Sequence, residues 1–373
     1  MPARFTAARF TALVDSLPAT VPFVGPETQE RARGKVFRAR IGANENAFGP
    51  SPKAVAAMQA EAAEAWKYCD PESHDLRHAV AAAHGVSPAN VHVGEGIDGI
   101  LGLVVRMLVE PGMPVVSSLG AYPTFNFHVA GFGGRLVTVP YRDDREDPQA
   151  LVDAVRREKA PLVYIANPDN PMGTWWPAGD IRRMVEAVPD GTLLLLDEAY
   201  AEFAPDGVSP VLDPDDPRVL RLRTFSKAHG LAGIRVGYAI GAPALIAGFD
   251  KVRNHFGISR VSQAGALAAI RDADHVPRVR GAVAAARDRI GEIARRNGLS
   301  PLPSATNFVT VDCGRDGAFA RRVLQALVAR DVFVRMPGVA PLDRCIRIGC
   351  GRPGELDILA DELPAALAEA ARA

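Results

Sequence analysis

Short apolar runs alternate with helical patterns through the first two-thirds of the chain. The runs at residues 114–118, 136–140, 162–166 and 192–196 have the length of buried strands, and residues 148–157 have a helical pattern. Strands that alternate with helices are typical of a parallel sheet covered by helices on both faces. The pattern therefore predicts an α/β fold with a mostly parallel sheet sandwiched by helices.

The hydrophobic pattern changes near residue 250. Residues 275–297 predict a long amphipathic helix, because apolar residues such as Val279, Val283 and Ala286 recur at spacings of four and three. The other elements predicted beyond residue 250 are helices at 261–271, 317–329 and 353–371 and strands at 307–312, 332–335 and 345–349. We expect a large domain over residues 41–249 and a smaller α+β domain over residues 250–373.

The first 40 residues are irregular, with prolines at 18, 22 and 26. We expect a short helix at residues 7–16, followed by an extended arm that contributes to the small domain. After a turn-rich loop at residues 41–52, a helix is predicted for residues 52–65.

Composition excludes several function classes. The 373 residues are 48% hydrophobic and 23% charged, and 43 basic residues balance 43 acidic ones, so there is no electrostatic footprint for nucleic acid or an anionic membrane. The four cysteines form no C-x-x-C pair, so no metal site is expected. Scattered thiols, and the absence of a signal peptide or of an apolar run of about 18 residues, predict a cytoplasmic protein.

One lysine has the surroundings of a reactive amine. The strand predicted at residues 220–224 ends shortly before Lys227, and open α/β sheets place their chemistry at such strand ends. Ser226 and Arg235 supply a hydroxyl and a cation, and three glycines between residues 230 and 237 allow the backbone to approach a ligand closely. A desolvated lysine beside another cation has a lowered pKa, which frees its amine to attack a carbonyl. These features describe a Schiff-base site for pyridoxal 5′-phosphate.

The segment T-F-S-K-A-H-G-L-A-G-I-R-V-G around Lys227 resembles the cofactor-lysine signature of the fold-type I, class I/II aminotransferases. Within that family it is most similar to the histidinol-phosphate aminotransferase branch. The resemblance implies a mostly parallel seven-stranded sheet, a smaller α+β domain and a homodimer whose active sites are shared between subunits. The resemblance covers nearly the whole chain, because five further motifs occur along it in the same order as in the family.

Three of these motifs supply groups for the cofactor ring. A carboxylate after an apolar strand, such as Asp197, needs a partner, and a protonated pyridine nitrogen would satisfy it. The sequence D-E-A-Y resembles the family's motif, which implies Asp197 on the ring nitrogen and Tyr200 on the phenolic oxygen. Asn167 to Thr174 resembles N-P-N-N-P-T-G, which implies that Asn170 also binds that oxygen. Tyr122, in G-A-Y-P-T-F, falls where the family places a ring stacked on the pyridine.

The resemblance also implies a phosphate site. The residues expected to bind the phosphate are Ser226, Arg235, the backbone N–H groups of Gly96, Ile97 and Asp98 at a helix start, and Tyr68 from the neighbouring subunit. The chain departs from the family here, because Ile97 and Gly99 replace a serine and a glutamate, and Cys69 replaces a proline. Asp169 and Met172 are departures in the asparagine motif.

The substrate is the least defined part. By family branch the first hypothesis is L-histidinol phosphate as amino donor and 2-oxoglutarate as acceptor. Arg347 lies in C-I-R-I-G-C-G, which resembles the family's motif for gripping the substrate's acid group, and Arg335 is a second strand-end arginine. Phe23, where the family often has a tyrosine, and Asn46 complete the expected substrate residues. Lys227, Asp197 and Tyr200 would be the catalytic residues.

Three alternatives remain. One is an amino-acid aminotransferase, for example for aromatic amino acids. Another is a phosphothreonine-type decarboxylase, which would release CO₂ and need no oxo-acid acceptor. The third is a non-catalytic regulatory module, but such regulators carry a DNA-binding domain, and the roughly 40 residues before the core contain no basic helix-turn-helix pattern.

Overall fold

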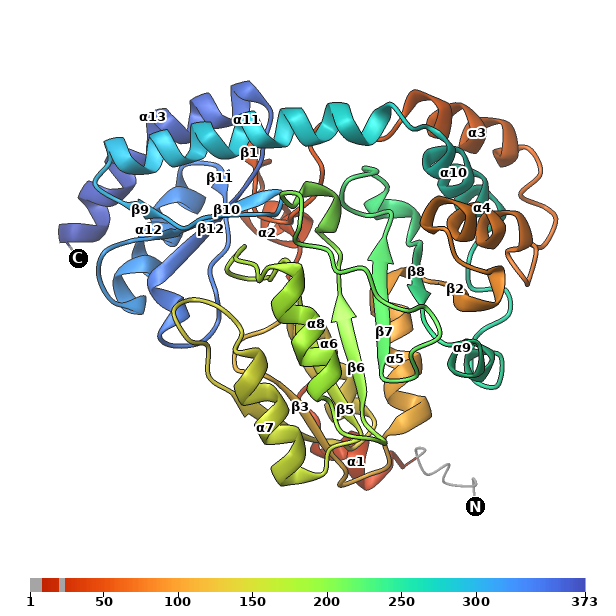
Figure 1. Ribbon diagram of the computed structural model, residues 1–373. Coiled ribbons are helices and arrows are strands. Elements are labelled where there is room, and N and C mark those ends of the chain that lie inside the picture. Colours follow the sequence, from red (N-terminus) through yellow and green to blue (C-terminus); the bar gives the residue numbers. More distant parts are fainter. Residues whose placement is uncertain (1–8, 20–23, 373) are drawn as a thin grey trace, which may run out of the picture.

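Seven strands form a central sheet in the computed structural model, which describes residues 9–19 and 24–372 (Figure 1). In spatial order they are β2 (Val91–Gly94), β8 (Gly237–Ile240), β7 (Val219–Thr224), β6 (Leu193–Asp197), β5 (Leu162–Ala166), β3 (Pro114–Ser118) and β4 (Arg135–Val139). Neighbours from β7 to β4 are parallel, and β8 is antiparallel to both β7 and β2. The expected fold class, a mostly parallel seven-stranded sheet, is confirmed.

Helices cover both faces of this sheet. The covering helices are α5 (Gly96–Leu108), α6 (Pro123–Gly131) and α9 (Pro243–Phe249) on one face and α7 (Pro148–Glu158) and α8 (Ala178–Ala187) on the other. Successive residues of β5 point to opposite faces, so Tyr164 packs with Phe125 of α6 while Val163 and Ile165 pack with Leu151 of α7. Burial of each large apolar side chain contributes about 1.5–3 kcal/mol to the stability of the fold, so the helices on both faces hold the sheet in place.

The C-terminal part builds a second, smaller unit, which is called the small layer below. The central sheet with its covering helices is called the large layer. Its elements are β9 (Ser300–Pro301), β10 (Phe308–Asp312), α12 (Gly317–Ala329), β11 (Val332–Phe333), β12 (Cys345–Gly349) and α13 (Pro353–Arg372). Strand β10 lies between β12 and β9, antiparallel to both. The long helix α11 (His275–Arg296) packs its apolar stripe into this layer and in Figure 1 runs across the top of the molecule to α13.

The N-terminal segment joins this small layer. Strand β1 (Ala39–Arg40) pairs in parallel with β11, and Ala39 and Ile41 are buried in the small layer's core. The helix α1 spans Ala12–Ser16. The extended arm predicted after it is wrong at Pro26–Arg33, which form the helix α2. Pro26 at the first helical position and Gly34 (φ 67°) after the last are ordinary helix start and stop signals.

Three helices form a separate group at one edge of the sheet. They are α3 (Pro52–Ala62), α4 (His74–His84) and α10 (Arg260–Arg271). Their core includes Ala54, Leu76 and Ala266, together with Phe225 and Tyr238 from beside and within the sheet. Helix α10 therefore packs with the large layer, although it lies beyond the predicted boundary at residue 250.

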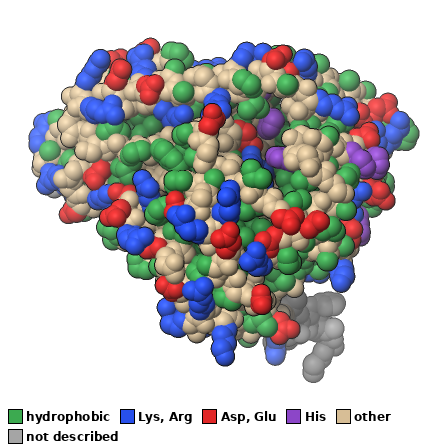
Figure 2. Space-filling view, in the orientation of Figure 1, with side chains coloured by type: hydrophobic (Ala, Val, Ile, Leu, Met, Phe, Trp, Pro, Cys, Tyr) green, Lys and Arg blue, Asp and Glu red, His purple; other side chains and the backbone are tan. Residues whose placement is uncertain are grey.

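The face seen in Figure 2 shows no large region of one charge. On the face seen in Figure 2, basic and acidic side chains are interspersed, as the balanced composition leads one to expect. No helix within residues 9–19 and 24–372 is long and apolar enough to cross a membrane.

Candidate active site

A cavity of about 430 Å³ opens at the carboxyl ends of the central strands. Most of the residues predicted for the site line it together. They are Ile97, Asp98, Tyr122, Asn170, Asp197, Tyr200, Ser226, Lys227, Arg235, Arg335 and Arg347. They come from the turns after β2, β3, β5, β6 and β7 and from the small layer, so the fold converges on the group that the motifs indicate.

Lys227 follows β7 and lies in this cavity as a half-buried side chain. Its Nζ donates a hydrogen bond of 3.0 Å to the carbonyl oxygen of Asn44 and lies 5.5 Å from the ring centroid of Tyr200. Burial lowers the pKa of the Lys227 amine to about 8, and the positive charges of Arg347 and Arg235 act in the same direction. A substantial fraction of this amine is therefore neutral and nucleophilic near neutral pH.

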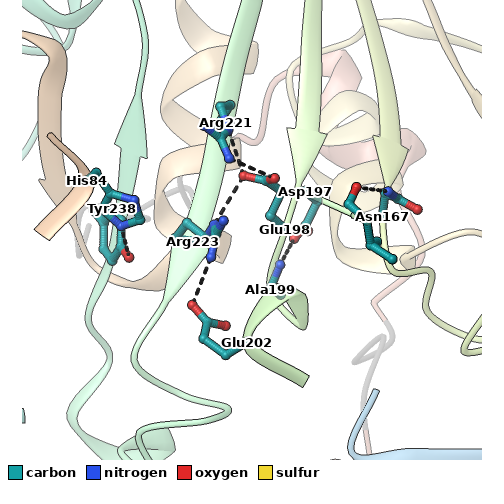
Figure 3. A network of polar contacts seen from close by, with 10 residues as sticks. His84, Asn167, Asp197, Glu198, Ala199, Glu202, Arg221, Arg223 and Tyr238 are labelled. Atoms are coloured by element: carbon teal, nitrogen blue, oxygen red, sulfur yellow. Dashed lines mark hydrogen bonds and ion pairs between the residues drawn. The ribbon is translucent and has the colours of Figure 1, made fainter. Parts of the chain in front are cut away.

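Asp197 ends β6 with its carboxylate 5% exposed. Its Oδ1 accepts a 2.9 Å hydrogen bond from the Ala199 backbone N–H, drawn in Figure 3, and its Oδ2 accepts one of 2.8 Å from the Tyr164 hydroxyl. Burial raises the pKa of Asp197 to about 6, although both hydrogen bonds oppose the rise. Among the residues that the structure describes, no cation forms an ion pair with Asp197, so this buried carboxylate is suited to pair with a cationic ligand atom.

Arg347 and Asn170 form another part of the cavity wall. Arg347 Nη1 donates a short hydrogen bond to Asn170 Oδ1, and the guanidinium lies 5.1 Å from the ring centroid of Phe308. The Nε of Arg347 is buried and has no hydrogen-bond partner in the part of the chain that the structure describes. Burial lowers the pKa of Arg347 to about 10, so the side chain is still cationic at neutral pH. An anion in the cavity would satisfy both its charge and its orphan N–H.

Arg335 is joined to Arg347 through the backbone. The Arg347 N–H donates to the Arg335 carbonyl at 2.6 Å, and the Arg335 N–H donates back at 3.2 Å. The Arg335 guanidinium also donates to the carbonyl of Val24, just before α2. Two cationic side chains therefore lie side by side on the small layer's wall of the cavity.

A further cationic corner lies at the start of α5. Arg235 Nη1 donates a 3.2 Å hydrogen bond to Ser226 Oγ. Gly96 has φ 76°, and a Cβ added there would lie 2.4 Å from Arg235 Nη2, so only glycine allows the guanidinium to lie against this turn. The unpaired N–H groups of the first helical turn, a hydroxyl and a guanidinium together form an anion-binding corner.

Two of the predicted residues that the structure describes, Tyr68 and Asn46, do not line the cavity. Tyr68 is 80% exposed and its ring packs on Phe256 with centroids 4.9 Å apart, outside the cavity of its own chain. The Asn46 side chain donates to the Ala228 carbonyl at 3.1 Å and does not line the cavity, whereas Asn44 does. Phe23 lies outside the described residues.

The sequence reading missed several residues of the site. Tyr164 and Asn44 line the cavity, and the Asn44 amide donates to the Tyr200 hydroxyl at 3.1 Å. Glu27, Arg40 and Glu45 line its mouth, where Arg40 binds both carboxylates. One available signal was the tyrosine in the otherwise apolar run L-V-Y-I-A, because a buried hydroxyl needs a partner.

A buried ion cluster supports the strands behind the site (Figure 3). Glu198 accepts hydrogen bonds from Arg221 at 2.8 Å and from Arg223 at 3.1 Å, and Arg223 also binds Glu202. Burial alone would raise the pKa of Glu198, but the charges of Arg223 and Arg221 outweigh it and keep that pKa low. The two arginines on β7 are thus paired inside the fold, so β6 and β7 are fixed against each other next to Asp197.

Comparisons with known proteins agree on one family. The sequence model of the family described as aminotransferase class I and II matches residues 39–363. The chain is 36% identical over 327 residues to histidinol-phosphate aminotransferase 1 of Mesorhizobium japonicum, covering 86% of this chain and 88% of the relative. It is also 36% identical over 347 residues to the histidinol-phosphate aminotransferase of Rhodospirillum centenum, covering 92% and 94%.

A solved structure agrees with this placement. The histidinol-phosphate aminotransferase from Sinorhizobium meliloti, solved in complex with pyridoxal-5′-phosphate, is 55% identical and superimposes with a TM-score of 0.94 over 97% of this chain and 98% of that chain. The family match over most of the chain, the fold and the cavity residues all agree, and the chain belongs to the class I and II aminotransferase family.

Proposed function

We propose that this protein is a pyridoxal 5′-phosphate-dependent aminotransferase that takes its amino group from L-histidinol phosphate and passes it to 2-oxoglutarate. The observation that carries the proposal is the placement of one low-pKa amine, Lys227, and one buried carboxylate, Asp197, in the same cavity. The names of the relatives described above support the choice of donor.

The cavity fits the cofactor by its own chemistry. The corner formed by Arg235, Ser226 and the start of α5 would hold the phosphate, and the contact between Gly96 and Arg235 leaves no room for a larger side chain there. Asp197 would bind the ring nitrogen, and Lys227 the aldehyde carbon. Asn170 and Tyr200 would bind the phenolic oxygen, and Tyr122 would stack on the ring. When bound, the cofactor supplies an electron sink for the charge left at the substrate's Cα.

The chain's own residues would move the protons. Lys227 Nζ, once displaced by the donor's amine, would take the proton from the donor's Cα as a general base and deliver it, as a general acid, to the carbon that was the cofactor's aldehyde carbon. Asp197 would keep the ring nitrogen protonated through its carboxylate, which Tyr164 and the Ala199 N–H hold in place. Tyr200, fixed by the Asn44 amide, would hold the phenolic oxygen.

The donor's anionic group would bind between the two arginines. Arg347 offers a buried N–H that has no partner among the described residues, and Arg335 is its backbone-paired neighbour. A phosphate has enough acceptor oxygens to satisfy both guanidinium groups. This arrangement favours a phosphorylated or otherwise acidic donor over an uncharged one.

We further propose that two copies of the chain share their active sites. Support comes from Tyr68 and Phe256, two aromatic side chains in contact that are 80% and 51% exposed although both are large. In a dimer Tyr68 would reach the phosphate corner of the second copy. The division into a large domain at 41–249 and a small one at 250–373 with the N-terminal arm likewise stays a prediction.

The test is a half-reaction screen of the purified holoprotein. Each candidate donor is added without acceptor, and conversion of the bound cofactor to its amine form is followed by absorbance. We expect L-histidinol phosphate to give the fastest conversion and 2-oxoglutarate to reverse it. Faster conversion by aromatic amino acids would replace the donor assignment, and CO₂ release without any acceptor would assign a decarboxylase. A Lys227→Ala variant with full turnover would overturn the whole proposal.

A further inference from the structure

Two buried carboxyl groups lie behind the Asn170 turn and take no part in the mechanism above. Glu146 precedes α7 and is 1% exposed, and Asp169 precedes Asn170 and is 2% exposed. The two carboxyl groups are neighbours in the fold, and each one influences the pKa of the other. Acidic side chains are almost never so fully buried unless they are paired with a cation, so this pair needs a physical explanation.

The other contacts of the pair are all with neutral donors. Glu146 accepts hydrogen bonds from the Ser118 hydroxyl at 2.6 Å and the Ala166 N–H at 2.8 Å. Asp169 accepts from the Tyr141 hydroxyl at 2.8 Å and the Met172 N–H at 2.9 Å. Within residues 9–19 and 24–372 neither carboxyl forms an ion pair. Two neighbouring buried carboxyl groups that have no cation to neutralise them are not both ionised near neutral pH.

The charged and titratable neighbours support a single charge on the pair. Burial raises the pKa of Glu146 well above its usual range, and the charge of Asp169 raises it further. Burial raises the pKa of Asp169 to about 7, while its hydrogen bonds and the nearby charge of Arg347 lower it. Asp197 faces Glu146 from β6 and raises its pKa. Tyr141, Tyr164 and Cys345 are uncharged near neutral pH, because burial raises their pKa values. Asp147, the next residue after Glu146, is ion-paired with Arg142.

The pair is connected directly to the anion-binding wall. Asp169 is adjacent in the chain to Asn170, whose Oδ1 accepts from Arg347. The turn is closed by hydrogen bonds from Asp169 N–H to Thr174 O at 2.8 Å and from Gly173 N–H to Asp169 O at 3.1 Å. The Asp169 side chain and backbone therefore set the position of the Asn170 amide.

We propose that Glu146 and Asp169 hold one shared proton and act as positioning residues that fix Asn170 and Arg347 for binding of the donor's anionic group. With one proton the pair carries a single negative charge. Loss of that proton adds a second negative charge behind Asn170, breaks the hydrogen bond between the carboxyls and attracts the Arg347 guanidinium away from the cavity. The grip on the anionic donor then weakens as the pH rises.

Conservative substitutions isolate the shared proton. In Asp169→Asn the amide can donate to an ionised Glu146, and in Glu146→Gln the amide can donate to an ionised Asp169. In each single variant the new amide donates to the remaining carboxyl and no second carboxylate repels it, and both changes favour its ionised form. Each single variant is therefore expected to keep one negative charge and no shared proton, and the double variant has no charge at all. Asparagine is also what the family motif N-P-N-N-P-T-G has at position 169, so Asp169→Asn is compatible with the fold.

The first measurement is infrared spectroscopy of the protein without substrate, as a function of pH. We expect the wild type to show a protonated-carboxyl C=O band that persists near neutral pH and disappears on the alkaline side. That band should be missing from Asp169→Asn and from Glu146→Gln. If both single variants keep it, or the wild type lacks it, no proton is shared and the proposal is overturned. This measurement does not depend on which donor the enzyme uses.

The second measurement rests on the proposed function, because it uses the anionic donor. From about pH 7 to about pH 9 the wild-type KM is expected to rise about three- to tenfold more than the KM of either single variant, while kcat changes in parallel in all proteins. Lys227 titrates in the same range but is common to all of them, so the difference reports the pair. Equal pH profiles would overturn the positioning role, whereas failure of every protein to use the donor would instead contradict the proposed substrate.

Discussion

The Tyr164 hydroxyl donates a 2.8 Å hydrogen bond to Asp197 Oδ2 from the neighbouring strand. The pairing register puts Ala166 of β5 opposite Asp197 of β6, so Tyr164, two residues earlier on the same face, points along the strand toward the carboxylate. Its ring stacks on Phe125 with centroids 4.8 Å apart, which holds the hydroxyl in place. Asp197 is thus positioned by a residue that is itself fixed by the core.

Tyr164→Phe is expected to weaken cofactor binding about tenfold, the equivalent of one hydrogen bond of about 1.4 kcal/mol. The change removes the hydroxyl that favours ionised Asp197, so the pKa of Asp197 rises above about 6. Titration of the apoprotein with pyridoxal 5′-phosphate measures the affinity. Tyr238→Phe is the matched control, because it removes a buried hydroxyl bound to His84 away from the cavity. Equal losses in both variants would contradict a specific role for Tyr164.

Attachment of the cofactor to Lys227 should follow the amine's lowered pKa. Only the neutral amine reacts, so the attachment rate of the apoprotein is expected to rise with pH and level off above a midpoint of about 8. Stopped-flow absorbance at a series of pH values measures it. Arg347→Gln removes a positive charge that lowers this pKa, and the midpoint should move upward. Arg289→Gln, on the surface beside Asp357, should leave it unchanged. A midpoint near the ordinary lysine value would contradict the burial of the amine.

The buried ion cluster beneath the site should be costly to break. Glu198→Gln leaves Arg221 and Arg223 without their shared carboxylate, and we expect a loss of about 3–5 kcal/mol in the free energy of unfolding. Urea denaturation followed by tryptophan fluorescence measures the change. Asp206→Asn removes a fully exposed partner of Arg280 and should cost less than about 1 kcal/mol. Similar losses in the two variants would show that burial of the cluster is not what matters.

Position 230, three residues after Lys227, requires glycine for two reasons: its backbone angle φ and the lack of space for a side chain. It has φ 69°, and an added Cβ would lie 2.3 Å from the Gly49 carbonyl oxygen. Gly34→Ala, at φ 67° with nothing within 4 Å, carries only the backbone cost of about 1–2 kcal/mol. Gly230→Ala is expected to lower Tm clearly more than Gly34→Ala in a thermal melt. An equal drop would mean that the loop at Gly49 can move aside freely.

Much of the site could be read from sequence because its groups sit in local motifs at strand ends. Lys227, Asp197 and Asn170 each follow a recognisable apolar strand, and the parallel sheet brings those ends together. Tyr164 could not be assigned in this way, because its role depends on the register between β5 and β6.

Glu146 shows the limit of a local reading. In the sequence D-D-R-E-D-P it resembles a solvated charged loop. It is buried because Ser118 and the Ala166 N–H, from two different strands, provide its hydrogen bonds. The helix α2 is a different case, since Pro26 and Gly34 were local signals that the prediction of an extended arm overlooked.

The pairing of β1 with β11 has a consequence for biosynthesis. Ala39 is synthesised long before Val332, its strand partner, because the whole large layer lies between them in the chain. The large layer can assemble while the chain is still growing, because N-terminal units generally fold first. The small layer must wait for residues 332–349, and with it the wall that carries Arg335 and Arg347. A nascent chain stalled before that point would be able to form the lysine's half of the pocket but not the half that grips the donor.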